Sequence, residues 1–394
     1  MRSWVPVPAG SDFPLENLPY GVFTTAGGTP RVGVAIGAHV LDLSLALPAG
    51  PFAVNSLNAF MALGPDEWAA TRERVHSILA DRPAALPDAA LVRQANAQLL
   101  LPFEVADYVD FYSSLEHATN LGRLFRPTSE PLLPNWRSLP VGYHGRAGTV
   151  VVSGTPIARP RGQRLQDGAP VFGPSTRLDF EAEVGFVVGS ASRLGESVGT
   201  GGVPDHIFGI VLVNDWSARD IQAWEYQPLG PFLGKSFATS ISPWVVPLAA
   251  LQDARTAPPP QEPEPAQHLR CKENWALDIE LEVSINGTVV SRPPFAGIYW
   301  TIAQQLAHLT SNGASLRVGD LLASGTVSGP AREQRGSLIE LSWNATEPIM
   351  LADGSARSFL ENGDEITITA RTKRGPRIGF GSVTGVVTSG VAPP

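Results

Sequence analysis

The sequence predicts a mostly β protein with two domains, and three observations support this fold class. Its 394 residues exceed the roughly 150 of a typical single domain. Glycine and proline are abundant, at 39 and 36 residues, which is typical of chains with many turns and short strands. Near Leu101 the composition changes, because helical patterns become rare and strands punctuated by glycine and proline take over. We therefore expect a first domain over residues 1–102 and a larger one over residues 103–394.

The first domain is expected to begin with strands and to continue with helices. Short apolar segments separated by glycine turns predict three strands, over residues 21–25, 31–36 and 39–43. Apolar residues at helical spacing predict two helices, over residues 57–63 and 65–79. Pro65 suits the first position of the second helix. A turn-rich link over residues 82–87 and a short helix over residues 91–99 complete this domain.

The second domain is expected to consist mainly of short strands. Helical spacing predicts three exceptions, over residues 113–125, 217–225 and 299–311. Residues 257–267 read APPPQEPEPAQ and predict a surface loop, because so many prolines suit neither a strand nor a helix.

The charge of the chain excludes several classes of partner. Lys and Arg total 29 against 37 Asp and Glu, for a net charge of -8. This deficit of cations argues against nucleic acid or an anionic membrane as the main partner. No segment reaches the roughly 18 uninterrupted apolar residues of a membrane helix, and the amino terminus lacks the apolar region of a signal peptide. A single cysteine, Cys271, suits a reducing compartment, so we expect a soluble, cytoplasmic protein.

An acidic strand is the first feature with chemical meaning. Residues 178–184 read LDFEAEV, so strand alternation puts Asp179, Glu181 and Glu183 on one face. One interpretation is a half-buried strand whose acidic face is solvated, and the segment alone favours it. The other is a cation site, since carboxylates at successive positions of one face repel each other unless a positive charge neutralises them.

A second polar group lies where a buried strand ends. Residues 208–213 are apolar and lead to Asp215. Ser217 and Asp220 then have the spacing of a helix capping box.

The helix that follows carries further polar side chains. Arg219 and Gln222 are three residues apart and therefore share a face of the expected helix, with Tyr226 one turn beyond. Either Asp215 and Arg219 belong to one polar site, or Asp215 caps backbone groups while Arg219 pairs with a surface acid. The segment leaves both interpretations open.

A histidine and a distant glutamate form a third signal. Helical spacing puts His117 on an apolar face, where a lone histidine is usually a core residue, but Asp110 and Tyr112 lie just upstream. Glu340 falls in an apparently buried strand over residues 338–341. An unpaired buried carboxylate is costly, and an imidazole would be a suitable partner.

Together these groups predict an oxygen-lined cation site beside a base. Ligation by carboxylates alone favours Mg²⁺ or Ca²⁺ over zinc. The sequence contains no G-x-S-x-G, H-E-x-x-H or C-x-x-C motif. Residues 230–236 resemble a phosphate-binding loop but have three residues between the glycines where that motif needs four.

Long segments of the chain resemble the fumarylacetoacetase family. They are DFYSSLEHATNLGRLFR, LLPNWRSLPVGYHGRAGTVVVSGTPI, FGIVLVNDWSARDIQAWEYQPLGPFLGKSF and GDLLASGTVSG, with SDFPLENLPYGVF and RVGVAIGAHVLDLS near the amino terminus. The resemblance covers nearly the whole chain. It implies an SH3-like barrel followed by a large mixed β-sandwich roll, and a homodimer.

The resemblance also implies roles for individual residues. The divalent metal ligands fall on Asp110, Glu181, Glu183 and Asp215, and a further cation position falls near Lys235 and Thr239. The catalytic groups are the general base His117, its orienting acid Glu340, and the polarising groups Arg219, Gln222 and Lys235. The substrate contacts are Tyr112, Arg126, Tyr143, Gln222, Tyr226 and Thr326. Ala238 stands where the family pattern has glycine, and a positive φ there would be strained.

The implied reaction is the hydrolysis of fumarylacetoacetate, a dicarboxylate, to fumarate and acetoacetate, which ends tyrosine and phenylalanine breakdown. A base that activates water, groups that stabilise an oxyanion, and a cation that stabilises a departing enolate suit this carbon–carbon cleavage. The alternatives are a related acylpyruvate hydrolase or oxo-acid decarboxylase, and a non-catalytic binding protein.

Overall fold

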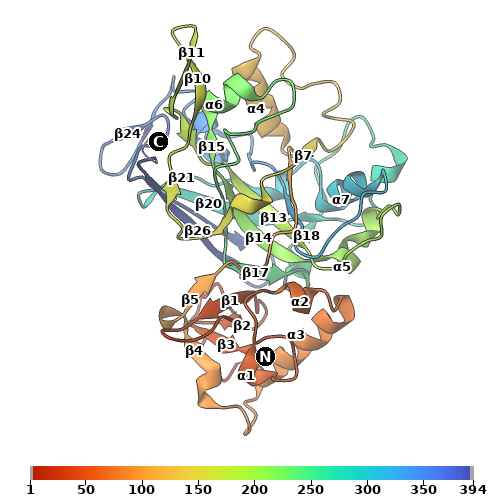
Figure 1. Cartoon of the computed structure of the whole chain (residues 1–394). Helices are drawn as coiled ribbons and strands as arrows, with labels where there is room; N and C mark the ends of the chain where they lie inside the picture. Colours follow the sequence, from red (N-terminus) through yellow and green to blue (C-terminus); the bar gives the residue numbers. More distant parts are fainter. Residues whose placement is uncertain (1–2, 391–394) are drawn as a thin grey trace.

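The structure, a computed structural model, describes residues 3–390 and confirms the mostly β class. Figure 1 shows a smaller N-terminal part, in red and orange, beneath a larger part that holds the rest of the chain. The strands of the two parts form a 13-stranded sheet, a five-stranded sheet and several two-stranded pairs. No helix in the described part of the chain combines the length and apolar character that a membrane crossing needs.

The N-terminal strands lie where the sequence predicts them. They are β1 (Tyr20–Thr24), β2 (Arg31–Ile36) and β3 (His39–Asp42). The two predicted helices are present as α2 (Asn58–Met61) and α3 (Pro65–Ala80), after a short α1 (Leu43–Ala46).

The helix predicted over residues 91–99 is wrong. Two strands, β4 (Leu91–Arg93) and β5 (Gln98–Leu100), take its place. Strand β4 pairs with β3 and β5 pairs with β1. Pairing with strands distant in the sequence therefore overrides the local helical pattern.

One sheet runs through both parts of the molecule. Its order is β4-β3-β2-β1-β17-β14-β13-β22-β6-β7, so β1 pairs with β17 (Trp244–Pro247) of the larger part. Gly21 of β1 lies against the Trp244 ring, where an added Cβ would be 2.6 Å from Cε3. The predicted boundary after residue 102 falls between β5 and β6 (Tyr108–Phe111), and both the boundary and the SH3-like barrel stay predictions.

The centre of this sheet is formed by long buried strands. They are β13 (Ala182–Val188) and β14 (Ile207–Asp215). The shorter buried strand β22 (Leu321–Ala323) pairs with β13, and the sheet ends at the short, mostly exposed β7 (Gly142–His144). Strands β13 and β14 are antiparallel, whereas β6 and β22 are parallel. Strand β16 (Thr239–Ile241) also pairs with β14, and β8 (Val150–Val152) pairs with β16.

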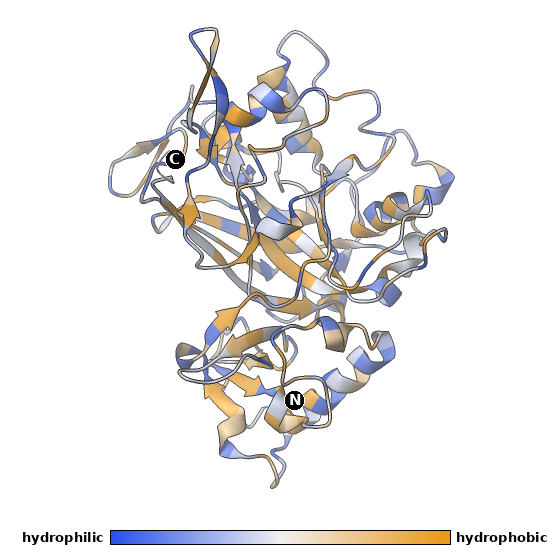
Figure 2. Ribbon diagram, in the orientation of Figure 1, coloured by the Kyte–Doolittle hydropathy of each residue, from blue (hydrophilic) through white to orange (hydrophobic). Residues whose placement is uncertain are grey.

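A second sheet packs against the first through an apolar core. Its order is β21-β20-β25-β26-β9, and β26 lies against β14. Its strands are β9 (Ile157–Ala158), β20 (Ile279–Ile285), β21 (Thr288–Ser291), β25 (Glu365–Thr372) and β26 (Gly379–Thr388). Figure 2 shows hydrophobic residues in orange along these inner strands, and one core cluster contains residues of both sheets.

The remaining elements are short and lie around the two sheets. The paired strands are β10 (Arg161–Gln166) with β11 (Ala169–Pro174), β12 (Leu178–Asp179) with β15 (Ser217–Ala218), β18 (Arg255–Thr256) with β19 (Ala276–Leu277), and β23 (Ile349–Met350) with β24 (Ala356–Arg357). Helix α5 (Val203–His206) precedes β14. The proline-rich residues 257–266 have no helix or strand, as predicted.

The three predicted helices of the larger part are present, each starting two or three residues late. They are α4 (Leu115–Phe125), α6 (Arg219–Glu225) and α7 (Ile302–Thr310). The predicted capping box of α6 is wrong, because Ser217 donates to the Asp215 carbonyl and Asp220 accepts from Ser175 and Thr176. The predicted strand over residues 338–341 is wrong too, since these residues form the short helix α8 (Leu338–Leu341).

Candidate active site

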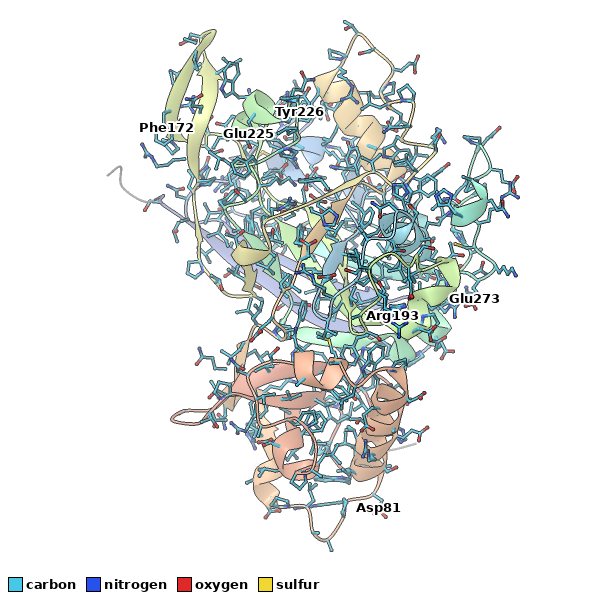
Figure 3. The ribbon with its side chains drawn as sticks, turned by 45° about the vertical axis from the view of Figure 1, so that its right-hand side comes forward. Asp81, Phe172, Arg193, Glu225, Tyr226 and Glu273 are labelled. Atoms are coloured by element: carbon cyan, nitrogen blue, oxygen red, sulfur yellow. The ribbon has the colours of Figure 1, made fainter. Side chains whose placement is uncertain are left out.

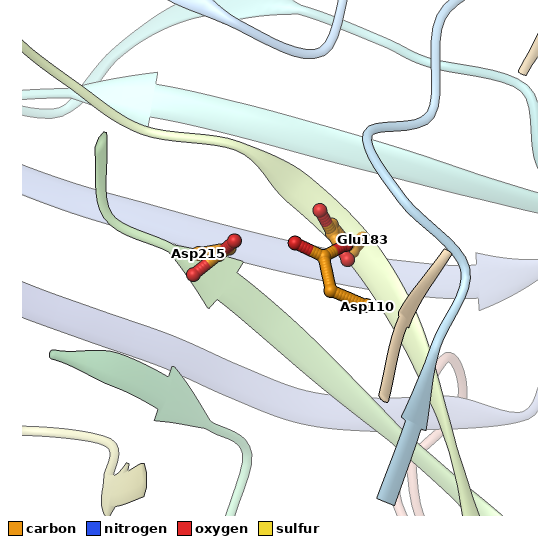
Figure 4. Close-up of side chains that lie close together, drawn as sticks. All are labelled: Asp110, Glu183 and Asp215. Atoms are coloured by element: carbon orange, nitrogen blue, oxygen red, sulfur yellow. The ribbon is translucent and has the colours of Figure 1, made fainter. Parts of the chain in front are cut away.

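Three carboxylates converge at the centre of the large sheet. Asp110 comes from β6, Glu183 from β13 and Asp215 from the end of β14, and one oxygen of each lies within 4.8 Å of the others. Figure 4 shows the three side chains pointing toward one another. All three are buried. Strand pairing brings them together, because β13 is a direct neighbour of β14 and is joined to β6 through β22.

Glu181 joins this triad through Lys235. The Lys235 ammonium contacts the Glu181 carboxylate and lies 2.8 Å from Oδ2 of Asp215. The other Glu181 oxygen lies 2.7 Å from Nη2 of Arg219. Thr239 donates to Oδ1 of Asp215 at 3.0 Å. The metal ligands and the cation position that the sequence suggests thus form one contiguous buried cluster.

Asp179 belongs to the cluster through Arg219 and is not a member of the triad. Its Oδ2 accepts from Nε of Arg219 at 2.8 Å, and its carboxylate also accepts from the backbone N–H groups of Leu338 and Ile339. The interpretation of residues 178–184 as a strand with a solvated acidic face is wrong, because Asp179, Glu181 and Glu183 are all buried. Arg219 likewise pairs with buried acids and not with a surface acid.

Arg146 is a member of the cluster that sequence reasoning missed. Its Nη2 lies 2.6 Å from Oδ2 of Asp110 and 2.7 Å from Oδ2 of Asp215. The residue follows a glycine in an irregular segment, where an arginine usually faces solvent, so no local pattern marks it. The only signal that points to Arg146 is its place in LLPNWRSLPVGYHGRAGTVVVSGTPI, one of the segments that resemble the family.

The charge balance of the cluster suits one divalent cation. With every carboxylate ionised, the formal charge of the buried acids exceeds that of the buried bases by two; the members are Asp110, Asp179, Glu181, Glu183 and Asp215 against Arg146, Arg219 and Lys235. Burial, together with the charges of Asp110 and Asp215, raises the pKa of Glu183 well above its usual value. Oε1 of Glu183 is buried and has no hydrogen-bond partner among residues 3–390. These oxygen donors fit a hard cation such as Mg²⁺ or Ca²⁺.

His117 stands between Glu340 and the acidic cluster. Its Nδ1 is 2.6 Å from Oε2 of Glu340, and its Nε2 is 3.8 Å from Oε1 of Glu181. Helix α4 fixes its position, because Ser114 accepts the His117 backbone N–H at 3.3 Å and caps the helix. His117 is almost fully buried, at 2% exposed.

Glu340 is held by more groups than the sequence suggested. Asn120 and Ser337 donate to its carboxylate at 2.9 and 2.7 Å, and the Ser328 hydroxyl lies 3.0 Å from it. Burial would raise the pKa of Glu340, but His117 and these hydrogen bonds lower it below the usual value. The carboxylate therefore stays charged and fixes the imidazole.

Several predicted substrate contacts line the same region. The Tyr112 ring meets the His117 ring edge-on at 5.4 Å, and the Tyr143 ring lies 5.1 Å from the Arg146 guanidinium carbon. The Thr326 hydroxyl is buried without a partner in the described residues. Gln222 accepts from Nη1 of Arg219 at 3.2 Å.

The hydrogen bonds of two other predicted contacts go to groups outside the cluster. Arg126 ends α4 and donates to the Pro131 carbonyl at 2.8 Å. Tyr226 follows α6, and its hydroxyl accepts from Gln227 at 3.1 Å. Figure 3 shows Tyr226 beside Glu225 at the top of the molecule. Ala238, at the departure from the family pattern, is buried and does not have a positive φ, so the backbone is not strained there.

Comparisons with known families cover both parts of the chain. Residues 16–102 match the fumarylacetoacetase N-terminal family and residues 107–388 match the fumarylacetoacetate hydrolase C-terminal family. The chain belongs to the fumarylacetoacetase family. The metal dependence of that family agrees with the buried triad.

Curated fumarylacetoacetases are similar to the chain over nearly its whole length. The rat enzyme is 49% identical, with 99% of this chain and all of that protein covered. The human enzyme is also 49% identical with the same coverage, and the Arabidopsis thaliana enzyme is 44% identical over 98% of each chain.

Solved structures share the fold at lower identity. A fumarylacetoacetate hydrolase from Exiguobacterium antarcticum has a TM-score of 0.57 at 17% identity, covering 94% of this chain and 99% of that one. A maleylpyruvate hydrolase from Sphingobium has a TM-score of 0.54 at 15% identity, covering 95% of this chain and 100% of that one.

Proposed function

We propose that the protein hydrolyses the carbon–carbon bond of fumarylacetoacetate to give fumarate and acetoacetate, the last step of tyrosine and phenylalanine breakdown. The observation that carries the proposal is the position of His117 between a buried carboxylate and an acidic cluster. Fumarylacetoacetase relatives at 44 to 49% identity support the substrate.

His117 acts as the general base. Glu340 holds Nδ1 and so leaves Nε2 free to accept a proton from water on the side of the acidic cluster. The charged Glu340 carboxylate also stabilises the imidazolium that forms. Asn120, Ser328 and Ser337 keep that carboxylate in place.

Asp110, Glu181, Glu183 and Asp215 hold a divalent cation, either Mg²⁺ or Ca²⁺, with Lys235 and Thr239 beside them. When bound, the cation stabilises the negative charge of the departing enolate.

Arg219, Gln222 and Lys235 stabilise the oxyanion that water attack creates. Arg219 and Lys235 are both buried, at 2% and 3% exposed, and a charge in a site of low dielectric constant interacts strongly with a developing anion. Gln222 aligns the Arg219 guanidinium through the hydrogen bond between them.

The two carboxylates of the substrate require polar contacts outside the reacting centre. We assign these contacts to Tyr112, Arg126, Tyr143, Gln222, Tyr226 and Thr326. Thr326 and Tyr143 are buried hydroxyls without partners among the described residues, so a bound ligand would satisfy both.

Loss of the diketone–enol absorbance of fumarylacetoacetate tests the proposal. The purified protein should consume fumarylacetoacetate far faster than acylpyruvates, lose activity in chelator, and regain it with Mg²⁺ or Ca²⁺. Preference for an acylpyruvate would favour the related hydrolase, and full activity in chelator would exclude the role of the metal.

A cytoplasmic homodimer completes the proposal. The single cysteine, Cys271, suits a reducing compartment. Large apolar side chains are exposed on the β10–β11 hairpin, on α6 and after α6: Leu165, Phe172, Trp224, Leu229, Phe232 and Leu233. Trp224 donates to Gln163 at 3.3 Å, so α6 and the hairpin adjoin, and Figure 3 shows Phe172 and Tyr226 in the same upper region of the molecule. An apolar surface of this kind favours a second copy of the chain as partner.

A further inference from the structure

Arg146 occupies an unusual position for a cation. It is the only Arg or Lys within ion-pair distance of Asp110 in the described chain, and it also contacts Asp215 through the same nitrogen. Its side chain is 4% exposed. These two acids are members of the triad that would hold the divalent cation, so Arg146 shares its partners with the metal.

The surroundings of Arg146 fix it in this position. The guanidinium carbon lies 4.6 Å from the Tyr108 ring centre and 5.1 Å from the Tyr143 ring centre, so two aromatic rings hold it. Its backbone has a φ of 62°, a left-handed conformation that is costly for arginine. The fold retains a strained backbone and buries a charge in order to place this group.

The electrostatic effect of Arg146 differs between the two states of the site. Without a metal, three buried carboxylates converge, and Arg146 reduces their mutual repulsion. With a divalent cation on the same carboxylates, the guanidinium and the metal carry charges of the same sign and repel each other. Arg146 therefore stabilises the metal-free site more than the loaded one.

We propose that Arg146 is a positioning residue that acts as a permanent counter-charge, keeping Asp110 and Asp215 in place without metal and weakening the binding of the divalent cation. The inference rests on the proposed metal site. The affinity of the metal is then a compromise between the carboxylates that attract it and the arginine that opposes it.

The test compares Arg146→Gln with the unchanged protein. Melting temperature is measured in chelator and in saturating Ca²⁺, and Ca²⁺ affinity is measured by titration calorimetry. Arg146→Gln should lower the melting temperature more in chelator than in Ca²⁺. Arg146→Gln should also bind Ca²⁺ more tightly, by about tenfold or more. The reason is that the substitution removes a positive charge that repels the cation.

Two further variants separate charge from structure. Arg146→Lys retains the positive charge and should restore Ca²⁺ affinity to within about threefold of the unchanged protein. Arg31→Gln is the matched control, since Arg31 also lies between a buried acid, Asp42, and an aromatic ring, Phe23, at 4.4 Å. It should lower the melting temperature equally with and without Ca²⁺.

Two results for Arg146→Gln would overturn the proposal. One is an equal loss of melting temperature in chelator and in Ca²⁺ with an unchanged Ca²⁺ affinity, and the other is weaker Ca²⁺ binding. If Arg146→Gln folds only with Ca²⁺, the proposal is supported. If Arg146→Gln folds in neither condition, the test rests on Arg146→Lys. A Ca²⁺ affinity of Arg146→Lys that differs by more than threefold from that of the unchanged protein then overturns the proposal. Failure of the unchanged protein to bind Ca²⁺ or Mg²⁺ would contradict the proposed function instead.

Discussion

The imidazole of His117 is suited to act as a base because one nitrogen is bound by a carboxylate and the other is left to accept a proton. Nδ1 is 2.6 Å from a carboxylate and Nε2 faces the acidic cluster. A histidine that merely filled the core would not need a charged partner held by three further hydrogen-bonding side chains.

His117→Ala should lower kcat by about 10²–10⁴-fold while Ca²⁺ still binds, since only proton transfer is removed. Steady-state kinetics and calorimetry measure the two effects. His144→Ala is the control, because His144 forms a similar 2.6 Å contact with Asp107 on the surface. Unchanged kcat in His117→Ala would contradict the assignment.

Residue types alone predicted part of the site. The sequence indicated that Glu340 needs a partner and that an imidazole would serve, but the two residues are 223 positions apart, which hides the contact. The resemblance supplied the set of residues, and the structure brings most of them together. Arg146 and Asn120 escaped prediction because their roles depend on neighbours that only the folded chain creates.

At the level of elements, the first turn of α4 connects folding to chemistry. Ser114 accepts the backbone N–H of His117, and its hydroxyl donates to the Ser328 carbonyl at 3.2 Å. One side chain therefore positions the helix that carries the base.

Ser114→Ala should destabilise the protein by about 1 kcal/mol and also lower kcat by about tenfold, because a small shift of His117 disturbs proton transfer. Ser56→Ala, which removes a similar hydroxyl at the start of α2, should lower stability alone. Chemical denaturation and kinetics separate the two. Equal kinetics in both variants would contradict the positioning role.

The entry to β25 depends on one acidic side chain. Asp364 accepts two hydrogen bonds from Arg357, at 2.9 and 3.0 Å, and others from Asn286 and the Glu361 backbone. Burial would raise the pKa of Asp364, but these hydrogen bonds lower it below the usual value.

Asp364→Asn should cost about 2 kcal/mol of unfolding free energy at pH 7, because a charged bidentate pair is lost. The pKa in the folded protein lies below the unfolded value of about 3.9, so the carboxylate stabilises the fold fully above that value. The difference between the variant and the unchanged protein should then shrink as the pH falls below about 4. Denaturation at several pH values measures it, with the exposed Asp205→Asn in α5 as control, and a constant difference would contradict the argument.

Elements with strong local patterns were predictable and those that depend on partners were not. Strand β2 and helix α3 lie close to their predicted bounds, because alternation or helical spacing extends over the whole segment. Residues 91–99 and 338–341 were assigned wrongly, since pairing with β3 and β1 fixes the first and the buried contacts of Glu340 fix the second.

At the level of the whole molecule, the exposed apolar side chains predict an interface. Leu229 is 94% exposed and Phe172 is 65% exposed, although both are large apolar residues. The combined substitutions Phe172→Glu and Leu229→Glu should convert a dimer to a monomer, as measured by light scattering. Leu194→Glu, at an equally exposed residue elsewhere, should leave the mass unchanged. A monomeric unchanged protein would contradict the homodimer.

The pairing of β1 with β17 bears on how the chain could be shortened. The N-terminal strands continue the central sheet, and a shared core contains Tyr20 and Val22 together with Phe208 and Val245. A fragment beginning at residue 103 would uncover that core and leave β17 with a free edge open to pairing with other molecules. The N-terminal part is consequently not an exchangeable module. Expression of the catalytic region alone should yield aggregates even though every catalytic side chain is retained.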